Sequence, residues 1–291
     1  MENFLGAAKK ALHSFHNGEY TKAFNSFARL LDFNITPVTK IRIINCRIAC
    51  QFNVGNLENC AIILNDMLTE FPQEPRAWYY AGKYHTLTHN QEKAIQCYHY
   101  AVSASPEFAE AHLALAEALK NSGQAAEAVL AMNRLLARFK SEQPVTKARG
   151  IRQQDILAEL ASLHYTSGKY ALCMASLEQS LNLSGEADFL HYELMAKCYL
   201  KLEQPVDALE KLEKYFMYNG MLHPDILILI ARAQCRLGRL DEAALTFAQA
   251  LSLAPDLVLE GEETADLLVL KQHADLDVIK SRFGTMELDY R

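Results

Sequence analysis

The fold is decided by residues 75–108, whose sequence is PRAWYYAGKYHTLTHNQEKAIQCYHYAVSASPEF. Apolar residues recur at helical spacing on both sides of a polar break around His89, which predicts two amphipathic helices joined by a short turn. In the second helix, the small Ala94 precedes the bulky Tyr98 by four positions. A small side chain beside a bulky one lets two helices approach closely and interlock. With Pro106 as a closing breaker, the stretch predicts one helical hairpin.

The same pattern recurs along the 291-residue chain. The small residues of the second helices are Ala23, Cys60, Ala94, Ala128, Cys173, Ala208 and Ala243. The bulky partners four positions later are Phe27, Leu64, Tyr98, Met132, Leu177, Leu212 and Phe247. A turn glycine recurs as Gly18, Gly55, Gly123, Gly168 and Gly238, whereas His89 and Glu203 occupy this place in the other two hairpins. A repeat of this length indicates stacked hairpins that share a continuous core.

This pattern resembles the tetratricopeptide repeat family. The best single match, 75–108, carries Trp78, Gly82, Ala94, Tyr98, Ala101 and Pro106 at the family's positions. Aligned on the small residue, the seven units are 4–37, 41–74, 75–108, 109–142, 154–187, 189–222 and 224–257. The resemblance implies an all-α fold, a right-handed superhelical solenoid of about seven hairpins over residues 1–257, with the first helix of each pair lining a concave groove. The motif residues are packing residues, so they indicate the fold and not the function.

Two segments depart from the repeat. Residues 143–153 form an insertion of eleven residues in a basic stretch, and we expect a solvated connection that bends the solenoid inside one domain. The alternative is a basic contact with an anionic partner. Residues 258–291 form an acidic region in which we expect a capping helix over the last hairpin. Its apolar residues are Leu267, Leu268, Leu270, Val278, Ile279 and Phe283.

Composition limits the classes of protein. The formal net charge is −6, so a nucleic-acid partner is not expected. No apolar run is long enough to span a bilayer, and the N-terminus lacks the features of a signal peptide. The seven cysteines show no CxxC spacing, which favours reduced thiols and a cytoplasmic location. No catalytic motif, cofactor loop or metal-ligand spacing is present, so we expect no enzyme, no cofactor and no metal.

The candidate binding residues are those that repeat geometry places on the concave face. In the second and third units they are Arg42, Asn45, Phe52, Arg76, Tyr79, Tyr80 and Lys83. A secondary set near the C-terminus consists of Lys197, Lys201, Arg232 and Arg236. The first set combines cations, an amide and aromatic rings without an acid, which suits a peptide with acidic side chains or a free carboxylate. The alternative is that these polar residues only keep the solenoid soluble.

The leading functional hypothesis is a non-catalytic adaptor or scaffold that binds a peptide segment or a protein surface in the concave groove. The alternative is the repeat arm of a larger enzyme or machine, such as a transferase or a pilus or secretion assembly, with catalysis elsewhere. Self-association into a homo-oligomer is a further expectation, because exposed apolar ends of solenoids can pair.

Overall fold

The computed structural model describes residues 3–140, 151–184, 189–219, 223–255, 259 and 262–272. These residues form fifteen α-helices and one 3₁₀ helix, and none of them lies in a strand, as the sequence predicts. None of the helices described is long and apolar enough to cross a membrane.

The chain divides into two compact units, Met1–Ile151 and Arg152–Arg291. The first contains α1 (Phe4–His16), α2 (Tyr20–Leu30), α3 (Pro37–Val54), α4 (Leu57–Glu70), α5 (Pro75–Leu87), α6 (Gln91–Ala104), α7 (Ala109–Asn121) and α8 (Ala125–Lys140). The second contains α9 (Gln153–Thr166), α10 (Tyr170–Ser184), α11 (Phe189–Lys201), α12 (Pro205–Asn219), α13 (Pro224–Arg236), α14 (Leu240–Leu253), α15 (Glu262–Leu267) and the 3₁₀ helix η1 (Leu268–Gln272).

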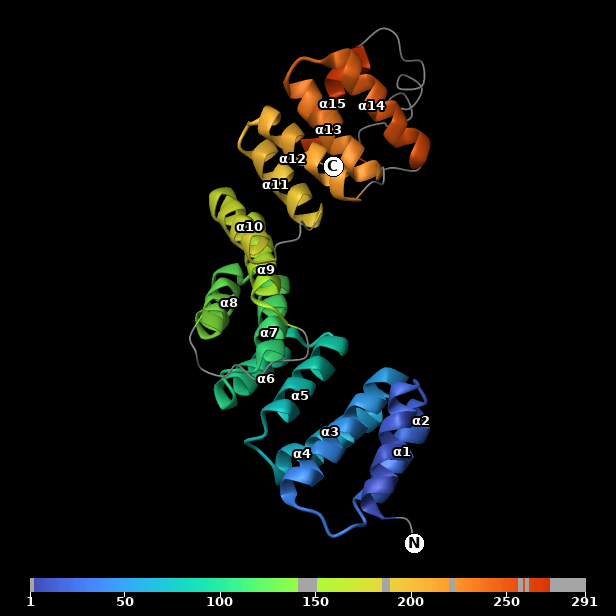
Figure 1. Cartoon of the computed structure of the whole chain (residues 1–291). Coiled ribbons are helices and arrows are strands. Elements are labelled where there is room, and N and C mark those ends of the chain that lie inside the picture. Colours follow the sequence, from blue (N-terminus) through green and yellow to red (C-terminus); the bar gives the residue numbers. More distant parts are fainter. Residues whose placement is uncertain are drawn as a thin grey trace. The chain divides into compact units, whose positions relative to one another are not determined.

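Each hairpin is closed by the residue pair that the sequence predicts. The seven small residues of the second helices are all fully buried, and their bulky partners are at most 3% exposed. Within each unit, a helix packs on the next helix in the chain, and first helices of successive hairpins also touch, such as α3 with α5 and α5 with α7 (Figure 1). A hairpin therefore buries one face internally and the other against its neighbour.

The turns inside the hairpins adopt a left-handed backbone. The five turn glycines have φ between 71° and 78°. His89 and Glu203 have φ of 57° and 58° at the equivalent places, so two residues with side chains carry a conformation that favours glycine. Such a conformation costs a residue with a Cβ about 1–2 kcal/mol. The packing of the two helices on each side holds these turns in place.

Two sequence-based boundaries differ from the structure. Residues 38–40, expected between the first two hairpins, lie inside α3, because Thr36 caps the helix and Pro37 occupies its first turn. The division between the two compact units falls after Ile151, within the segment where the sequence analysis predicts a bend inside one domain. Of this insertion, residues 143–150 lie outside the described part of the chain.

The second unit ends in the expected cap. Leu267 of α15 and Leu270 of η1 are buried in one cluster with residues of α13 and α14, including Leu227 and Phe247. Leu268 is 41% exposed, so it points away from this cluster. Val278, Ile279 and Phe283 lie outside the described residues. The cap therefore covers the apolar side of the last hairpin with two leucines.

Candidate binding groove

The first unit contains a groove of about 880 Å³ between its first helices, called the main groove below. It is lined by Phe4, Ala8, Leu12, Phe15, His16, Phe27, Leu30, Thr39, Arg42, Ile43, Asn45, Cys46, Ala49, Glu74, Pro75, Arg76, Tyr80, Ser105, Phe108 and Glu110. Twelve of these twenty residues are apolar or aromatic, so the walls from α1, α3 and α5 can desolvate a bulky apolar group.

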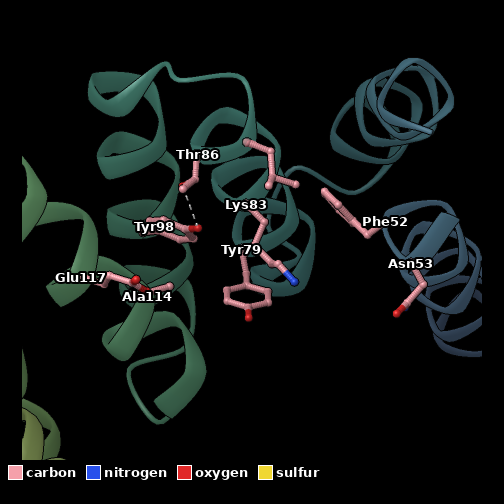
Figure 2. Close-up of a pocket in the computed structure, with 9 residues that line it drawn as sticks. Phe52, Asn53, Tyr79, Lys83, Thr86, Tyr98, Ala114 and Glu117 are labelled. Carbon is pink, nitrogen blue, oxygen red and sulfur yellow. Dashed lines mark hydrogen bonds between the residues drawn. The ribbon is translucent and has the colours of Figure 1, made fainter. Parts of the chain in front are cut away.

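A smaller pocket of about 360 Å³ adjoins the main groove and is called the side pocket below. It is lined by Phe52, Asn53, Tyr79, Lys83, Thr86, Leu87, Tyr98, Ala114 and Glu117. Lys83 and Tyr79 project from α5 between the end of α3 and the side of α7 (Figure 2). The Tyr98 and Thr86 hydroxyls are 3.2 Å apart and hydrogen-bonded, which positions one edge of the pocket.

Aromatic rings separate the two cavities. Phe52 of the side pocket stacks on Tyr80 of the main groove with ring centroids 5.8 Å apart. Tyr79 lies next to Tyr80, at 5.5 Å, and next to Phe108, at 5.2 Å. Two or three rings held against one another have little conformational entropy left to lose when a ligand binds. These aromatic rings therefore form a pre-organised surface between the main groove and the side pocket.

The main groove presents two polar groups that have no partner within the described part of the chain. Asn45 is 7% exposed, and its amide oxygen accepts no hydrogen bond. Leaving such a buried acceptor unpaired costs about 1–3 kcal/mol. The Tyr80 hydroxyl also makes no hydrogen bond to another described residue, and burial raises its pKa to about 12. A few unpaired polar groups on apolar walls are typical of a ligand site.

The charges of the main groove are mixed. Arg42 and Arg76 are exposed and form no ion pair with other described residues, and the Arg76 guanidinium lies 5.4 Å from the Phe108 ring centroid. Glu74 and Glu110 line the same groove. The first set of predicted binding residues contains no acid. The structure adds these two acids to the groove, because the starts of α5 and α7 lie beside it. The groove is thus apolar with charges of both signs at its edge.

Glu74 and Glu110 also stabilise the helices at whose N-termini they lie. The Glu74 carboxylate caps α5 by accepting a hydrogen bond of 3.3 Å from the Arg76 backbone N–H. Glu110 lies in the first turn of α7. A negative charge at a helix N-terminus is stabilised by the helix dipole, whereas neither arginine has such a counterpart. The arginines are therefore the charges most available to a ligand.

All seven residues of the first predicted set line one of the two cavities. Arg42, Asn45, Arg76 and Tyr80 line the main groove, whereas Phe52, Tyr79 and Lys83 line the side pocket. The Lys83 ammonium lies 5.3 Å from the Phe52 ring centroid, so it is held over a ring rather than in an ion pair. In the side pocket, Glu117 provides a charge of opposite sign.

The four cations of the secondary set interact with other residues of the chain. The Arg232 Nε and Arg236 Nη2 atoms lie 2.8 and 2.9 Å from Asp266 of the cap, and Arg236 also donates to the backbone carbonyl of Leu200. Lys197 pairs with Glu193 at 2.6 Å, and Lys201 also has an interaction partner. The two arginines of this set therefore attach the cap to the last hairpin, and a binding role for the secondary set stays a prediction.

The α1 wall is the part of the site that the sequence analysis leaves out. Phe4, Ala8, Leu12 and Phe15 follow one another at helical spacing and line the main groove. The apolar periodicity of residues 4–15 is visible in the sequence, but it predicts a buried face as well as a groove wall.

Comparison with known families agrees with the fold. Tetratricopeptide repeat models match residues 89–149 and residues 193–257, one in each unit. No curated protein matches the sequence significantly. Together with the hairpin geometry, these matches show that the chain contains tetratricopeptide repeats in both units.

Solved structures with this fold include several repeat proteins. The C-terminal part of a repeat protein from Cytophaga hutchinsonii aligns with a TM-score of 0.65 at 17% identity, covering 89% of this chain and 98% of that one. The type IV pilus biogenesis factor PilW gives 0.61 at 19% identity over 80% and 100%. YrrB, described as a repeat protein with an unusual peptide-binding site, gives 0.51 at 13% identity over 66% and 93%. At these identities the likeness concerns the fold alone.

Proposed function

We propose that this protein is a non-catalytic adaptor that binds a segment of a partner protein on the concave face of its first unit. Stacked helical hairpins commonly present such faces to partners. The observation that carries the proposal is that the predicted cations and aromatic residues line two adjoining cavities instead of being scattered over the surface.

The composition of the surface supports a protein ligand. Tyrosine and arginine side chains carry much of the binding energy at protein interfaces, and here Arg76, Tyr79 and Tyr80 come from consecutive turns of α5. The stacked ring of Phe52 extends this surface to α3. A partner segment lying along α5 would cover all four side chains.

The alternative proposal is a repeat arm of a larger assembly. PilW is described as a pilus biogenesis factor, but its likeness to this chain supports only a common fold. YrrB is described as having a peptide-binding site, which agrees with the adaptor proposal in kind. Neither similarity identifies binding residues in this chain. The adaptor proposal therefore rests on the groove itself.

The test is affinity purification with charge-reversed chains. The double variant Arg76→Glu/Lys83→Glu should lose captured partners that the unchanged protein retains, with helical content by circular dichroism unaltered. Arg29→Glu/Lys93→Glu is a matched control, because it reverses two exposed cations on the second helices α2 and α6. Equal capture by both double variants would refute binding through this face.

A further inference from the structure

The main groove differs from a simple charged surface in one respect. Most of its lining residues are apolar or aromatic, yet the Asn45 amide oxygen and the Tyr80 hydroxyl form no hydrogen bond with other described residues. The backbone N–H and C=O groups of a bound peptide need hydrogen-bond partners of their own, so they can pair with these two groups. The groove therefore combines a pocket for a side chain with contacts for a backbone.

The size of the groove indicates what the side chain can be. A volume of about 880 Å³ exceeds what a single small residue fills, and the walls include Leu12, Phe15 and Ile43. Burying a large apolar side chain there removes apolar surface of both partners from water. A charged side chain at the same depth would lose its hydration without an ionic partner. The occupant should thus carry a leucine, methionine or phenylalanine.

The charges at the edge indicate what flanks that side chain. Arg42 and Arg76 approach the groove from α3 and α5 and have no ionic partner among the described residues. Arginine pairs with carboxylates in two-point contacts, so a ligand acid beside the apolar residue is favoured. Glu74 is engaged at the start of α5, which lowers its competition for the arginines.

From these observations we infer that the main groove binds a peptide segment of a partner protein with one bulky apolar anchor and an acidic residue close to it. The anchor lies between α1, α3 and α5, Asn45 and Tyr80 bind the peptide backbone, and Arg42 or Arg76 pairs with the acid. The inference rests on the proposed function and specifies its ligand.

The probe is a phage-displayed library of random dodecapeptides, selected on the full chain. We expect enriched peptides with a leucine, methionine or phenylalanine and with an aspartate or glutamate within a few residues of it. The best peptide is then synthesised with a fluorescein label, and its dissociation constant is measured by fluorescence polarisation. Peptides enriched in basic residues, or no enrichment on the folded chain, would overturn the inference.

Steric variants locate the peptide. Ala49→Trp places a large ring into the main groove and should weaken binding at least tenfold. Ala126→Trp, at an exposed position of α8 outside both cavities, is the matched control and should change binding less than twofold, whereas Ala114→Trp tests the side pocket. Ala8→Trp blocks the groove from α1 and serves if Ala49→Trp does not fold. Sensitivity to Ala114→Trp alone would place the peptide in the side pocket and overturn the inference.

Charge and thiol measurements complete the test. Arg42→Glu/Arg76→Glu should weaken the acidic peptide at least tenfold and favour a version with lysine in place of the acid. Bound peptide should also slow alkylation of Cys46, which lines the groove, but not of Cys235, the other incompletely buried cysteine. Equal alkylation rates at Cys46 with and without saturating peptide would contradict the placement.

The two proposals fail in different ways. If affinity purification depends on Arg76 and Lys83 but the selected peptides lack an apolar anchor, the adaptor function stands and the inference is wrong. If neither partners nor peptides depend on either cavity, both are wrong.

Discussion

Replacing Gly82 with alanine tests how closely the hairpin of α5 and α6 is packed. A Cβ at this position would lie 2.4 to 2.8 Å from three ring carbons of Tyr98, whereas ordinary contacts are about 3.5–4.0 Å. The Tyr98 ring is 3% exposed and its hydroxyl is bonded to Thr86, so it has little room to move. Overpacking of this kind costs about 1–3 kcal/mol.

Part of this cost is offset. Alanine is about 1 kcal/mol more favourable than glycine inside a helix, and Gly82 lies in the interior of α5. Because the Cβ would approach the ring so closely, we take an overpacking cost in the upper half of its range, about 2–3 kcal/mol. Subtracting the helix gain of about 1 kcal/mol leaves an expected net loss of about 1–2 kcal/mol in the free energy of unfolding. Tyr98 also lines the side pocket, so a displaced ring would change the shape of that cavity.

The assay uses the single tryptophan of the chain. Trp78 lies one turn before Gly82 on α5 and stacks on Tyr100 with centroids 4.7 Å apart, so its fluorescence reports on this hairpin. With a urea dependence of about 2 kcal/mol per molar, Gly82→Ala should lower the unfolding midpoint by roughly 0.5–1 M.

A second background makes the test decisive. In Tyr98→Leu the ring is absent, so adding Gly82→Ala should be neutral or stabilising by up to about 1 kcal/mol. The sign of the alanine effect is thus expected to invert between the two backgrounds. An equal loss in both would refute the packing explanation, because it would show that the cost does not come from Tyr98.

Three further predictions concern other parts of the fold. Glu203→Gly should raise the stability of the second unit by about 1 kcal/mol, because glycine relieves the left-handed turn, and thermal unfolding followed by circular dichroism measures this. Asp266→Ala should lower it by about 3 kcal/mol, because Arg232 is left buried without its main partner. Burial lowers the pKa of His112 and His164, so the free energy of unfolding should decrease as the pH falls below about 6.5, the usual pKa of an unfolded histidine.

The sign of the pH effect follows from proton binding. In the folded protein the pKa of both imidazoles is lower than in the unfolded chain. At acidic pH the unfolded chain therefore binds more protons than the folded protein, and acid favours unfolding. His112→Gln/His164→Gln should flatten the pH dependence of stability. A dependence as steep in this double variant as in the unchanged protein would contradict the assignment to these two histidines.

Controls for the other two predictions are available in the chain. Gly168→Ala should destabilise, since its φ of 71° is unfavourable for a residue with a Cβ. Glu242→Ala removes an exposed pair with Arg239 at 3.8 Å and should cost less than about 1 kcal/mol. If Asp266→Ala costs no more than Glu242→Ala, the ionic attachment of the cap is not what holds it.

The hairpins could be predicted because their causes are local. The spacing of a small and a bulky residue, as in Ala94 and Tyr98, follows from helical periodicity, and the turn residues are restricted by backbone sterics. Even the two exceptions, His89 and Glu203, were identified by alignment with the turn glycines and have the positive φ that their places require. Burial of the aligned residues confirms these predictions.

The binding site was predictable only in part. Arg42, Tyr79 and Tyr80, which repeat geometry places on the concave face, line the two cavities, and their role in binding stays a prediction. Repeat geometry placed Glu110 on the concave face as well, but it missed Glu74, because this residue is the N-cap of α5 and precedes the helical positions that the repeat aligns. Nor could periodicity show that Asn45 is buried without a hydrogen-bond partner for its amide oxygen.

The sequence by itself determined that the chain forms helical hairpins of the tetratricopeptide type, because each hairpin depends on residues within about 34 positions of one another. Tertiary structure decided which side chains remain available. Repeat geometry places Arg232 and Arg236 on the concave face, as it does Arg42 and Arg76, but Asp266, which lies 34 and 30 residues beyond the first two, pairs with both. Whether a cation finds such a partner depends on how distant segments pack, and a local pattern carries no information about that.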